Sequence, residues 1–572
     1  MPERPWLSQY DKGVPHSLKP YPEKTLLDVL RDAAKENPLH PALLFKGASI
    51  SYSELELQSG AFAAALVSAG VRKGDRVAIL LPNSPQMIIA EFGIWKAGAV
   101  AVPINPLYTG HELTHALTEC GAETAIVLTL FYAKLNEIRG KTALKRVITS
   151  SIKEYLPSLK KVLFTLLKEK REGHRIALGR GDLTMQGMIA AHTSSSVPHI
   201  TVKPADPALF LFSGGTTGKP KCAIGSHHAM IISGMQIGAW FGVILKSSSD
   251  IIVLNMPLFH VYAQLGIMTS GLIRNYPLAL VPNPRDIDDL LDTIKSLRPA
   301  VLPGVPTLFN ALAAHPRLQR DPTLLRSLKL IVSGASSLHL DTKKRFEELT
   351  GGQIIEAYGL TESMIASVCT PVLGVRKAGA VGIPAPDVDI RIVDHEGSGE
   401  AMPAGQVGQI LMHAPQLMMG YWKNPEETAA IIRDGWLHTG DLGYLDEEGF
   451  LFIVDRMKDV IKPGGFQVWP REVEEVIAMH PSVRETGVAG VPDDYQGEAV
   501  KAWVVLRDGC NLAADELKIH CRQALAAYKV PKHVEFRQTL PKSMIGKVLR
   551  RALVDEHNTE EGKKGRKGTA RV

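Results

Sequence analysis

The chain has 572 residues, a formal net charge of +6, and 45% hydrophobic and 22% charged residues. This length exceeds what one compact core usually supports, so we expect at least two domains, and the ordinary composition excludes a disordered chain. The modest charge, partly in the last residues, argues against nucleic-acid binding and favours small anionic ligands. Five scattered cysteines without a Cys-x-x-Cys pair argue against disulfides or structural zinc and favour a reducing compartment.

The N-terminal sequence MPERPWLSQYDKG carries prolines and charges where a secretion signal would need an apolar run. The longest apolar stretch, residues 251–273, contains Pro257 and His260 and lacks flanking anchors, so we predict that it is buried inside the protein. We therefore expect no transmembrane segment and a cytoplasmic location, which leaves open a peripheral contact at the inner face of a membrane.

Helical patterns such as residues 53–70 alternate with short β-rich runs, which predicts a layered α/β architecture without a fixed-period repeat. The β-rich runs lie at 76–81, 99–104, 124–129 and 250–256. The composition changes near residues 455–459, where a glycine-containing hairpin signal at 463–468, a helix opening at Pro470 and short strands follow. The predicted fold is a large N-terminal domain of layered α/β subdomains (1–456), a small α+β C-terminal domain (457–557) and a flexible basic tail (558–572).

A zinc-protease pattern, H-E-x-x-H, occurs at His111, Glu112 and His115, and Thr109 is placed to cap a helix there. No convincing third ligand segment follows, and a random match in a chain of this length has a likelihood of roughly a few per cent. A zinc metalloprotease therefore stays only as a remote alternative.

A helical apolar stripe with basic neighbours runs through residues 152–171, and Pro157 predicts where the helix begins. The apolar positions are Ile152, Tyr155, Leu156, Leu159, Val162, Leu163, Leu166 and Leu167. One interpretation is a helix resting on anionic lipid through residues 157–171, and the other is a surface helix packed on its own domain. We favour the second interpretation.

The segment LFSGGTTGKPK, residues 211–221, predicts polyphosphate binding. Glycines let main-chain N–H groups approach an anion, hydroxyls add donors or reach a metal ion, and lysines neutralise charge. The segment is not the common G-x-x-x-x-G-K-[ST] loop, because Ser213 stands where that loop has glycine and Pro220 where it has Ser or Thr. A different ATP chemistry is indicated.

At this loop the sequence resembles the adenylate-forming superfamily of acyl-CoA synthetases, luciferases and peptide-synthetase adenylation domains, although Cys222 departs from the family's usual glycine. Similar matches continue in order from residue 52 to residue 553. The resemblance implies an ATP-binding loop made of Ser213, Gly214, Gly215, Thr216, Thr217, Gly218, Lys219 and Lys221. It also implies a large ATP- and acid-binding domain and a mobile C-terminal domain.

The resemblance extends to EAYGLTES, residues 356–363, which looks like the family's adenine and metal segment. It implies that Tyr358 stacks on adenine, that Thr361 contacts phosphate, and that Glu362 binds Mg²⁺ together with Thr216. An aromatic face and a hard carboxylate ligand suit these roles. The implied ATP site further includes Ser333, Gly334, Ala335, Glu356, Ala357 and Gly359.

WLHTGD, residues 436–441, resembles the family's ribose segment, with Asp441 accepting from the ribose hydroxyls and Arg456 assisting. In PKSMIGKVLRR, residues 541–551, the resemblance places the catalytic lysine at Lys547, where it would contact the substrate carboxylate and the α-phosphate. Taken alone, such a lysine would be read as a solvated surface charge.

NMPLFHVYA, residues 255–263, resembles the segment where acyl-CoA ligases carry histidine, so His260 argues against amino acids as substrates. In the family the matching histidine helps to open the pantetheine tunnel. The hairpin at 458–476 resembles the segment that swings in after adenylation, with Lys458 as hinge. The implied coenzyme A site is Gly464, Gly465 and Phe466.

Together these resemblances imply an acyl-CoA ligase that uses ATP, Mg²⁺, coenzyme A and a carboxylic acid, most like the medium- or long-chain fatty acyl-CoA synthetases. An enzyme for aryl or other acids, or one passing the acyl group to a carrier protein, stays open, as does an oligomer. Small residues at Gly234, Gly238 and Gly242 beside Trp240 and Phe241 predict either an acyl tunnel or a closely packed core helix.

Overall fold

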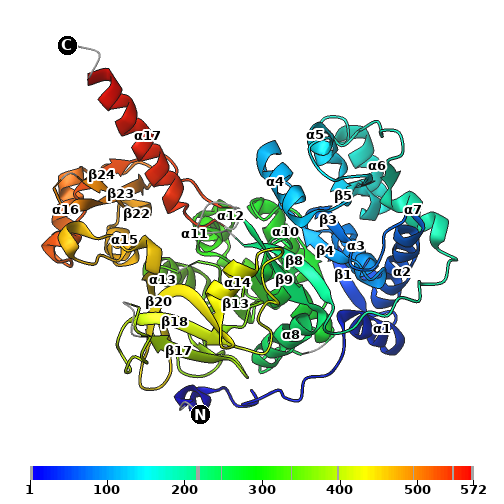
Figure 1. Ribbon diagram of the computed structural model, residues 1–572, viewed down its shortest axis with the longest axis horizontal. Helices are drawn as coiled ribbons and strands as arrows, with labels where there is room; N and C mark the ends of the chain where they lie inside the picture. Colours follow the sequence, from blue (N-terminus) through cyan, green and yellow to red (C-terminus); the bar gives the residue numbers. More distant parts are fainter. Residues whose placement is uncertain are drawn as a thin grey trace.

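Two mainly parallel sheets form the frame of the N-terminal part in the computed structural model (Figure 1). The structure describes residues 4–213, 220–246, 248–336, 338–395, 399–493, 495–543 and 546–568. One sheet has the order β16-β15-β14-β13-β12-β10-β11-β1-β2, and the other β7-β6-β5-β3-β4-β8-β9. In chain order their strands are β1 (Pro41–Phe45), β2 (Ala48–Ser51), β3 (Arg76–Leu80), β4 (Val100–Pro103), β5 (Thr124–Leu128), β6 (Arg146–Ser150), β7 (Leu183–Thr184), β8 (Pro207–Ser213), β9 (Lys221–Ser226), β10 (Ile252–Leu254), β11 (Leu278–Leu280), β12 (Val301–Gly304), β13 (Leu330–Ser333), β14 (Ile354–Tyr358), β15 (Val368–Cys369) and β16 (Ile383–Pro384).

The four predicted β-rich runs correspond to β3, β4, β5 and β10. β3 pairs in parallel with both β4 and β5, and these strands are almost wholly buried, as continuous apolar runs in covered parallel sheets are. Helices α2 and α3 pack together beside this sheet, and every residue of α3 is buried. The helices of the N-terminal part are α1 (Leu26–Glu36), α2 (Tyr52–Ser68), α3 (Pro85–Lys96), α4 (Gly110–Cys120), α5 (Tyr132–Arg139), α6 (Ser158–Leu167), α7 (Met185–His192), α8 (His227–Phe241), α9 (Ser270–Ile273), α10 (Ile287–Leu297), α11 (Pro306–Ala314), α12 (Pro316–Arg320), α13 (Leu340–Thr350) and α14 (Pro425–Ile431).

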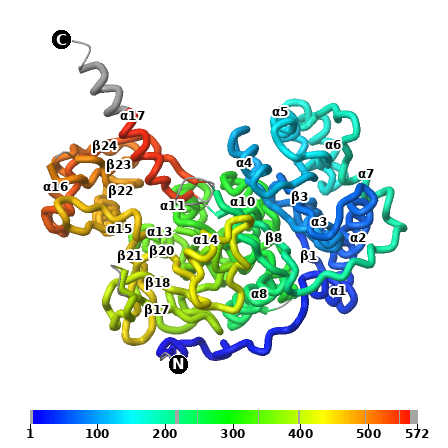
Figure 2. Tube along the Cα trace, in the orientation of Figure 1, coloured from blue at the N-terminus to red at the C-terminus, as the bar shows by residue number. Residues whose placement is uncertain are grey.

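A third, antiparallel sheet joins these layers to the C-terminal unit. Its order is β17-β18-β20-β19, with β21 paired to β20. Its strands are β17 (Asp389–Val393), β18 (Gly408–His413), β19 (Ile432–Arg433), β20 (Trp436–Leu445) and β21 (Leu451–Arg456). Figure 2 shows the N-terminal segment running beside this sheet, where Arg4 forms a 2.6 Å ion pair with Asp389.

The C-terminal unit has the predicted α+β character. Strands β22 (Val483–Asp493), β23 (Gly497–Leu506) and β24 (His533–Phe536) form its sheet, with helices α15 (Pro470–Ala478), α16 (Ala514–Arg522) and α17 (Arg550–Gly568). The predicted hairpin closes through main-chain hydrogen bonds between Ile461 and Val468. Helix α17 continues to Gly568, into the segment 558–572 expected to be a flexible tail.

The apolar stretch 251–273 lies inside the protein, as predicted. It forms β10, the π-helix η4 (Tyr262–Thr269) and α9, and every residue of η4 is buried. Within the described ranges, no helix is long and apolar enough to cross a membrane. Because π-helices are rare and often occur at functional sites, η4 is a candidate ligand-binding segment.

The H-E-x-x-H segment forms the start of α4, with Thr109 as the predicted cap. The Glu112 carboxylate accepts hydrogen bonds from the Thr109 N–H (2.7 Å) and hydroxyl (2.9 Å), which completes a capping box. Glu112 therefore stabilises the helix end. In the part of the chain that the structure describes, no cluster of three His, Cys, Asp or Glu side chains could hold a metal ion.

Helix α6 begins directly after Pro157, as predicted, but none of its side chains is buried. The expectation that the apolar stripe packs on its own domain therefore holds for Ile152, Tyr155 and Leu156, which pack against the core, but is wrong for α6 itself. Periodicity shows that a helix has an apolar face, but the surrounding fold decides whether another element covers that face.

Candidate active site

An apolar pocket lies where β13 and β14 end, beside α8 and η4. β12, β13 and β14 run parallel, and ligands in α/β sheets commonly bind outside the carboxyl ends of such strands. The pocket has an empty volume of about 480 Å³. Side chains from α8, η4 and the loop after β14 give it apolar walls, among them Ile237, Phe241, Ile267 and Ile365.

One wall of the pocket is a ledge of main chain formed by Gly334 and Ala335. A Cβ atom on Gly334 would lie 3.3 Å from the Tyr262 ring and 3.4 Å from the Ala357 carbonyl oxygen, so a side chain there would crowd its neighbours. Ala335 has a φ of +67°, in the left-handed region. Ala357, Tyr358 and Gly359 also line the pocket. Flat main chain beside an aromatic ring suits a planar base.

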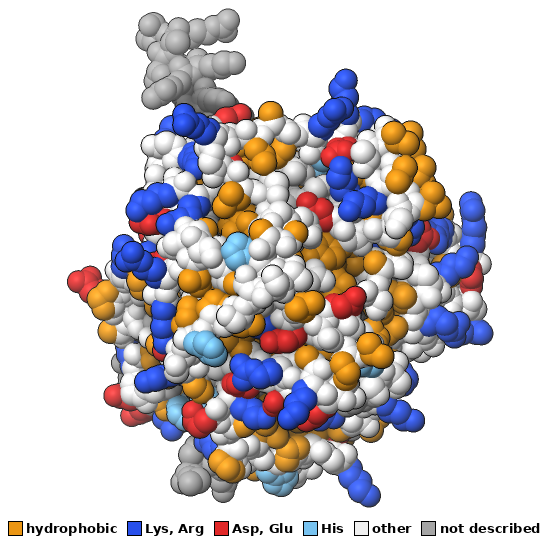
Figure 3. All heavy atoms as spheres, turned by 90° about the vertical axis from the view of Figure 1, so that its right-hand side faces the viewer, with side chains coloured by type: hydrophobic (Ala, Val, Ile, Leu, Met, Phe, Trp, Pro, Cys, Tyr) orange, Lys and Arg blue, Asp and Glu red, His pale blue; other side chains and the backbone are white. Residues whose placement is uncertain are grey.

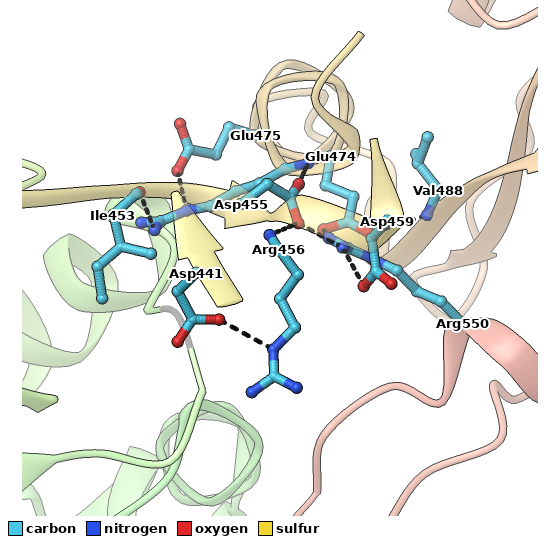
Figure 4. A network of polar contacts seen from close by, with 10 residues as sticks. Asp441, Ile453, Asp455, Arg456, Asp459, Glu474, Glu475, Val488 and Arg550 are labelled. Atoms are coloured by element: carbon cyan, nitrogen blue, oxygen red, sulfur yellow. Dashed lines mark hydrogen bonds and ion pairs between the residues drawn. The ribbon is translucent and has the colours of Figure 1, made fainter. Parts of the chain in front are cut away.

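Two side chains fix the Asp441 carboxylate at the edge of the pocket, where its oxygens are suited to accept hydrogen bonds from a diol. Its Oδ2 accepts a hydrogen bond from the Tyr358 hydroxyl (2.7 Å), and its Oδ1 forms an ion pair with Arg456 Nε (3.1 Å; Figure 4). Strand pairing sets this geometry, because Asp441 of β20 lies opposite Arg456 of β21. Burial, followed by the Asp441 charge, raises the pKa of Tyr358 well above its usual value, so its hydroxyl stays a donor.

Lys547 reaches this group from the C-terminal unit. A short turn holds it, in which the Lys547 N–H donates to Ser543 Oγ (3.1 Å) and the Ser543 N–H donates to the Lys547 carbonyl (2.8 Å). The turn lies directly against α11, since a Cβ atom on Gly546 would clash with Thr307 Oγ1. Burial, and then the Arg456 charge, lower the pKa of Lys547 to about 8.

His260 lines the same pocket in its neutral form. Burial, and then the Lys547 charge, lower the pKa of His260 to about 4. The main-chain N–H of Tyr262 donates to His260 Nδ1 (3.3 Å), which leaves the proton on Nε2. The structure thus brings His260 of the N-terminal part close to Lys547 of the C-terminal unit.

The Lys547 pKa predicts an alkaline limit to the chemistry at this site. A lysine whose pKa is lowered loses its charge at lower pH, so kcat/KM for the step that needs this charge should fall about tenfold per pH unit above pH of about 8. A pH profile of ATP–pyrophosphate exchange would measure it. Lys547→Arg should remove the alkaline decline, and a flat wild-type profile would contradict the assignment.

The Glu362 side chain is held by Tyr421, which the sequence did not identify as a site residue. The Tyr421 hydroxyl donates to Glu362 Oε1 (2.7 Å) and also faces Ser213, the last residue of β8. Among the described residues, the second carboxylate oxygen of Glu362 has no hydrogen bond. Tyr421 reaches this place through a bridge with Ala223 in β9, a long-range pairing that local pattern does not encode.

Comparisons with known proteins decide the family. Residues 30–422 match the AMP-binding enzyme family, and residues 472–547 match the AMP-binding enzyme C-terminal domain. The chain belongs to the AMP-binding enzyme family. A long-chain-fatty-acid–CoA ligase from Bacillus subtilis (strain 168) is 38% identical over 567 residues, covering 97% of this chain and 98% of that protein.

Two solved structures are similar to this AMP-binding enzyme over most of its length. The ATP-bound RpMatB-BxBclM chimera B1 has a TM-score of 0.83 and 30% identity, covering 94% of this chain and 99% of that one. The anthranilate CoA ligase AuaEII in complex with anthranoyl-AMP has a TM-score of 0.80 and 26% identity, covering 93% and 96%. The resemblance and fold class inferred from the sequence are confirmed.

Other predicted site residues of this AMP-binding enzyme have the following places in the structure. Glu356 is buried in an ion pair with Lys343 (3.1 Å) and, like Asp441 and Lys547, is not among the residues that line the apolar pocket. Lys221 pairs with Glu427 (2.7 Å). Thr361 lies in the turn after β14. The loop residues Gly214, Gly215, Thr216, Thr217, Gly218 and Lys219 lie outside the described residues.

The predicted coenzyme A hairpin lies in the C-terminal unit, and the described residues of the pocket lining do not include it. Gly464 and Gly465 have positive φ values of +57° and +88°, which glycine adopts readily. The exposed Phe466 ring stacks on Tyr528, with centroids 4.6 Å apart. Lys458 lies between this hairpin and β21, in the 3-10 turn Met457–Asp459.

The glycines of α8 serve packing, whereas Phe241 faces the pocket. A Cβ atom on Gly234 would lie 2.5 Å from Ile273 and one on Gly238 2.9 Å from Arg274. Trp240 is fully buried and donates from Nε1 to the Thr370 carbonyl (3.0 Å). The sequence left open whether these glycines line an acyl tunnel or allow close packing of a core helix. The structure supports close packing for Gly234 and Gly238.

Tyr421→Phe should weaken the metal-dependent step without unfolding the protein. The change removes one hydrogen bond to Glu362, worth about 1 kcal/mol, so we expect an approximately fivefold rise in the Mg²⁺ concentration needed for half-maximal ATP–pyrophosphate exchange. Tyr444→Phe is the matched control, because Tyr444 stacks on Phe452 instead. Equal Mg²⁺ dependence of both variants would argue against the proposed role of Glu362.

Proposed function

We propose that this AMP-binding enzyme is an ATP-dependent, AMP-forming acid–CoA ligase that activates a medium- or long-chain fatty acid through an acyl-AMP intermediate. The observation that supports this proposal is an apolar pocket lined by Tyr358, whose hydroxyl donates to Asp441, with Lys547 close enough to Asp441 to feel its charge. The 38% identity to a protein named long-chain-fatty-acid–CoA ligase supports the choice of acid.

In the first half-reaction a carboxylate oxygen attacks the α-phosphorus of ATP, and the bond to pyrophosphate breaks. Lys547 supplies positive charge where the carboxylate meets the α-phosphate, because with a pKa of about 8 it is mostly charged at neutral pH. Asp441 holds the ribose hydroxyls, and Gly334 and Tyr358 hold the base.

Glu362 fits a Mg²⁺ ligand, since its carboxylate keeps one oxygen without a hydrogen bond among the described residues. Thr216 would be a second ligand. When bound, Mg²⁺ neutralises charge on the departing pyrophosphate.

In the second half-reaction the coenzyme A sulfur attacks the acyl carbon, the bond to AMP breaks, and the thiol proton is released. We assign coenzyme A to Gly464, Gly465 and Phe466, which requires the domain 457–557 to rotate about Lys458 relative to 1–456. The stacked pair Phe466–Tyr528 offers an exposed aromatic surface for this ligand. His260, neutral in the pocket, would line the thiol's path.

Two alternative substrates deserve a direct test. The solved structure with anthranoyl-AMP favours an aryl acid as the second candidate, and a carrier protein could replace coenzyme A as acceptor.

A further proposal is that the enzyme is cytoplasmic and that its contact with membranes is peripheral, through residues 157–171.

The deciding experiment incubates the protein with ATP, Mg²⁺, coenzyme A and acids from acetate through palmitate to benzoate. Mass spectrometry would follow AMP and acyl-CoA. Acyl-CoA with matching AMP from fatty acids supports the proposal. Benzoyl-CoA alone would favour the aryl candidate, acyl-AMP without thioester would favour another acceptor, and no turnover of any acid would overturn the function.

A further inference from the structure

Helix α6 exposes an apolar stripe that no other part of the described chain covers. Its large aliphatic side chains have exposed fractions between 46% and 75%. These side chains are Leu159, Val162, Leu163, Leu166 and Leu167. Their spacing places them along one face of the helix. An exposed apolar patch of this kind marks an interaction site.

The helix is anchored from its other side, so the stripe is held facing outward. Phe164 is the half-buried residue of α6, and its ring packs edge-on against His174 at 5.3 Å. Lys160 Nζ donates to the Lys46 carbonyl (2.6 Å), beside the β1–β2 turn. The following turn is fixed by an ion pair between Lys153 and Glu169 (2.6 Å).

Positive charge surrounds the stripe. Residues 151–180 contain eight Lys and Arg and three Glu, a net charge of +5 on 30 residues, against +6 for the whole chain. Two of the glutamates are already paired, Glu169 with Lys153 and Glu172 with Arg171. Lys161, Lys170, Arg175 and Arg180 are exposed. Figure 3 views the side of the molecule on which α5 to α7 lie, and there hydrophobic side chains gather near the upper edge among Lys and Arg.

We infer that α6 and its basic flanks, residues 157–180, form a docking surface for an anionic lipid bilayer. Leucines entering the acyl boundary and lysines facing the headgroups are the two parts of an interfacial amphipathic helix. A second copy of this chain fits poorly, because two surfaces of net positive charge would repel each other. The use of this contact rests on the proposed function, since a long-chain acid partitions into the bilayer from which the enzyme would take it.

Vesicle co-sedimentation tests this surface without depending on catalysis. The probe is full-length protein mixed with phosphatidylcholine vesicles containing about one third phosphatidylglycerol. Leu163→Asp/Leu166→Asp should reduce the bound fraction about tenfold, and about 1 M salt should reduce wild-type binding. Both positions are exposed, so the variant should fold, which thermal melting would verify.

Leu373→Asp/Val375→Asp is the matched control, because it adds the same charge at two exposed side chains outside α6. Unchanged binding of this control together with loss for the α6 variant supports the docking surface. Equal binding of wild type and both variants would overturn it, as would equal wild-type binding to vesicles of phosphatidylcholine alone. Sedimentation of wild type without vesicles would instead indicate self-association and also contradict the inference. Absence of ligase activity would leave these results unaffected, so the two proposals fail separately.

Discussion

Replacing Lys547 with alanine should lower the rate of adenylation by about a thousandfold while leaving thioester formation from synthetic acyl-AMP nearly unchanged. The Lys547 charge stabilises the negative charge that builds up when the carboxylate attacks the α-phosphate. Once acyl-AMP has formed, this attack is complete and the charge is no longer needed. Its pocket position depends on the Ser543 turn and the contact of Gly546 with Thr307, which both belong to the arrangement seen here. ATP–pyrophosphate exchange measures the first step, and single-turnover mixing of acyl-AMP with coenzyme A measures the second.

Lys542→Ala is the matched control for this experiment. Lys542 lies in the same segment but pairs with Glu485 (2.7 Å) inside the C-terminal unit, so its loss should alter both steps only slightly. If Lys547→Ala loses both half-reactions equally, the proposed division of labour between two domain orientations is wrong.

Strands β3, β4, β5 and β10 and the starts of α4, α6 and α15 could be predicted from the sequence because their signals are local. Continuous apolar runs gave β3, β4 and β5, and a capping residue marked the start of α4. The exposure of α6 could not be predicted, since periodicity does not say what lies beside a helix. Its Pro157 start was predictable because proline fits the first turn.

The site was predictable as a set of motifs but not as an arrangement. Asp441 and Arg456 meet through strand pairing, and Tyr421 reaches Glu362 through a bridge to β9, neither of which local sequence encodes. Glu356 was assigned to ATP by its neighbours in the motif. It lies two residues, about 7 Å, before Tyr358 along β14, deeper in the sheet, where Lys343 neutralises it.

Asp455→Asn should slow adenylation about thirtyfold and leave thioester formation equal or faster. Asp455, buried in β21 of the large domain, accepts hydrogen bonds from the main-chain N–H of Arg471 (2.7 Å) and the guanidinium of Arg550 (2.8 Å), which both lie beyond Lys458 (Figure 4). Rotation about Lys458 must break these contacts, so they stabilise only the orientation that brings Lys547 to the pocket. Weakening them by about 2 kcal/mol shifts that equilibrium by about thirtyfold.

Glu472→Gln is the control for this last experiment, because Glu472 lies in the same helix α15 but pairs with Lys529 (2.7 Å) entirely within the C-terminal unit. It should leave the ratio of the two half-reactions unchanged. Arg550 also holds Glu474 (2.7 Å), so the C-terminal unit keeps its own buried ion pair when Asp455 is altered, and thermal melting should register only a modest loss. Equal slowing of both half-reactions by Asp455→Asn would mean that Asp455 supports the fold as a whole. A selective loss of adenylation would mean that the carboxylate at the end of β21 sets how long the enzyme stays in its first orientation.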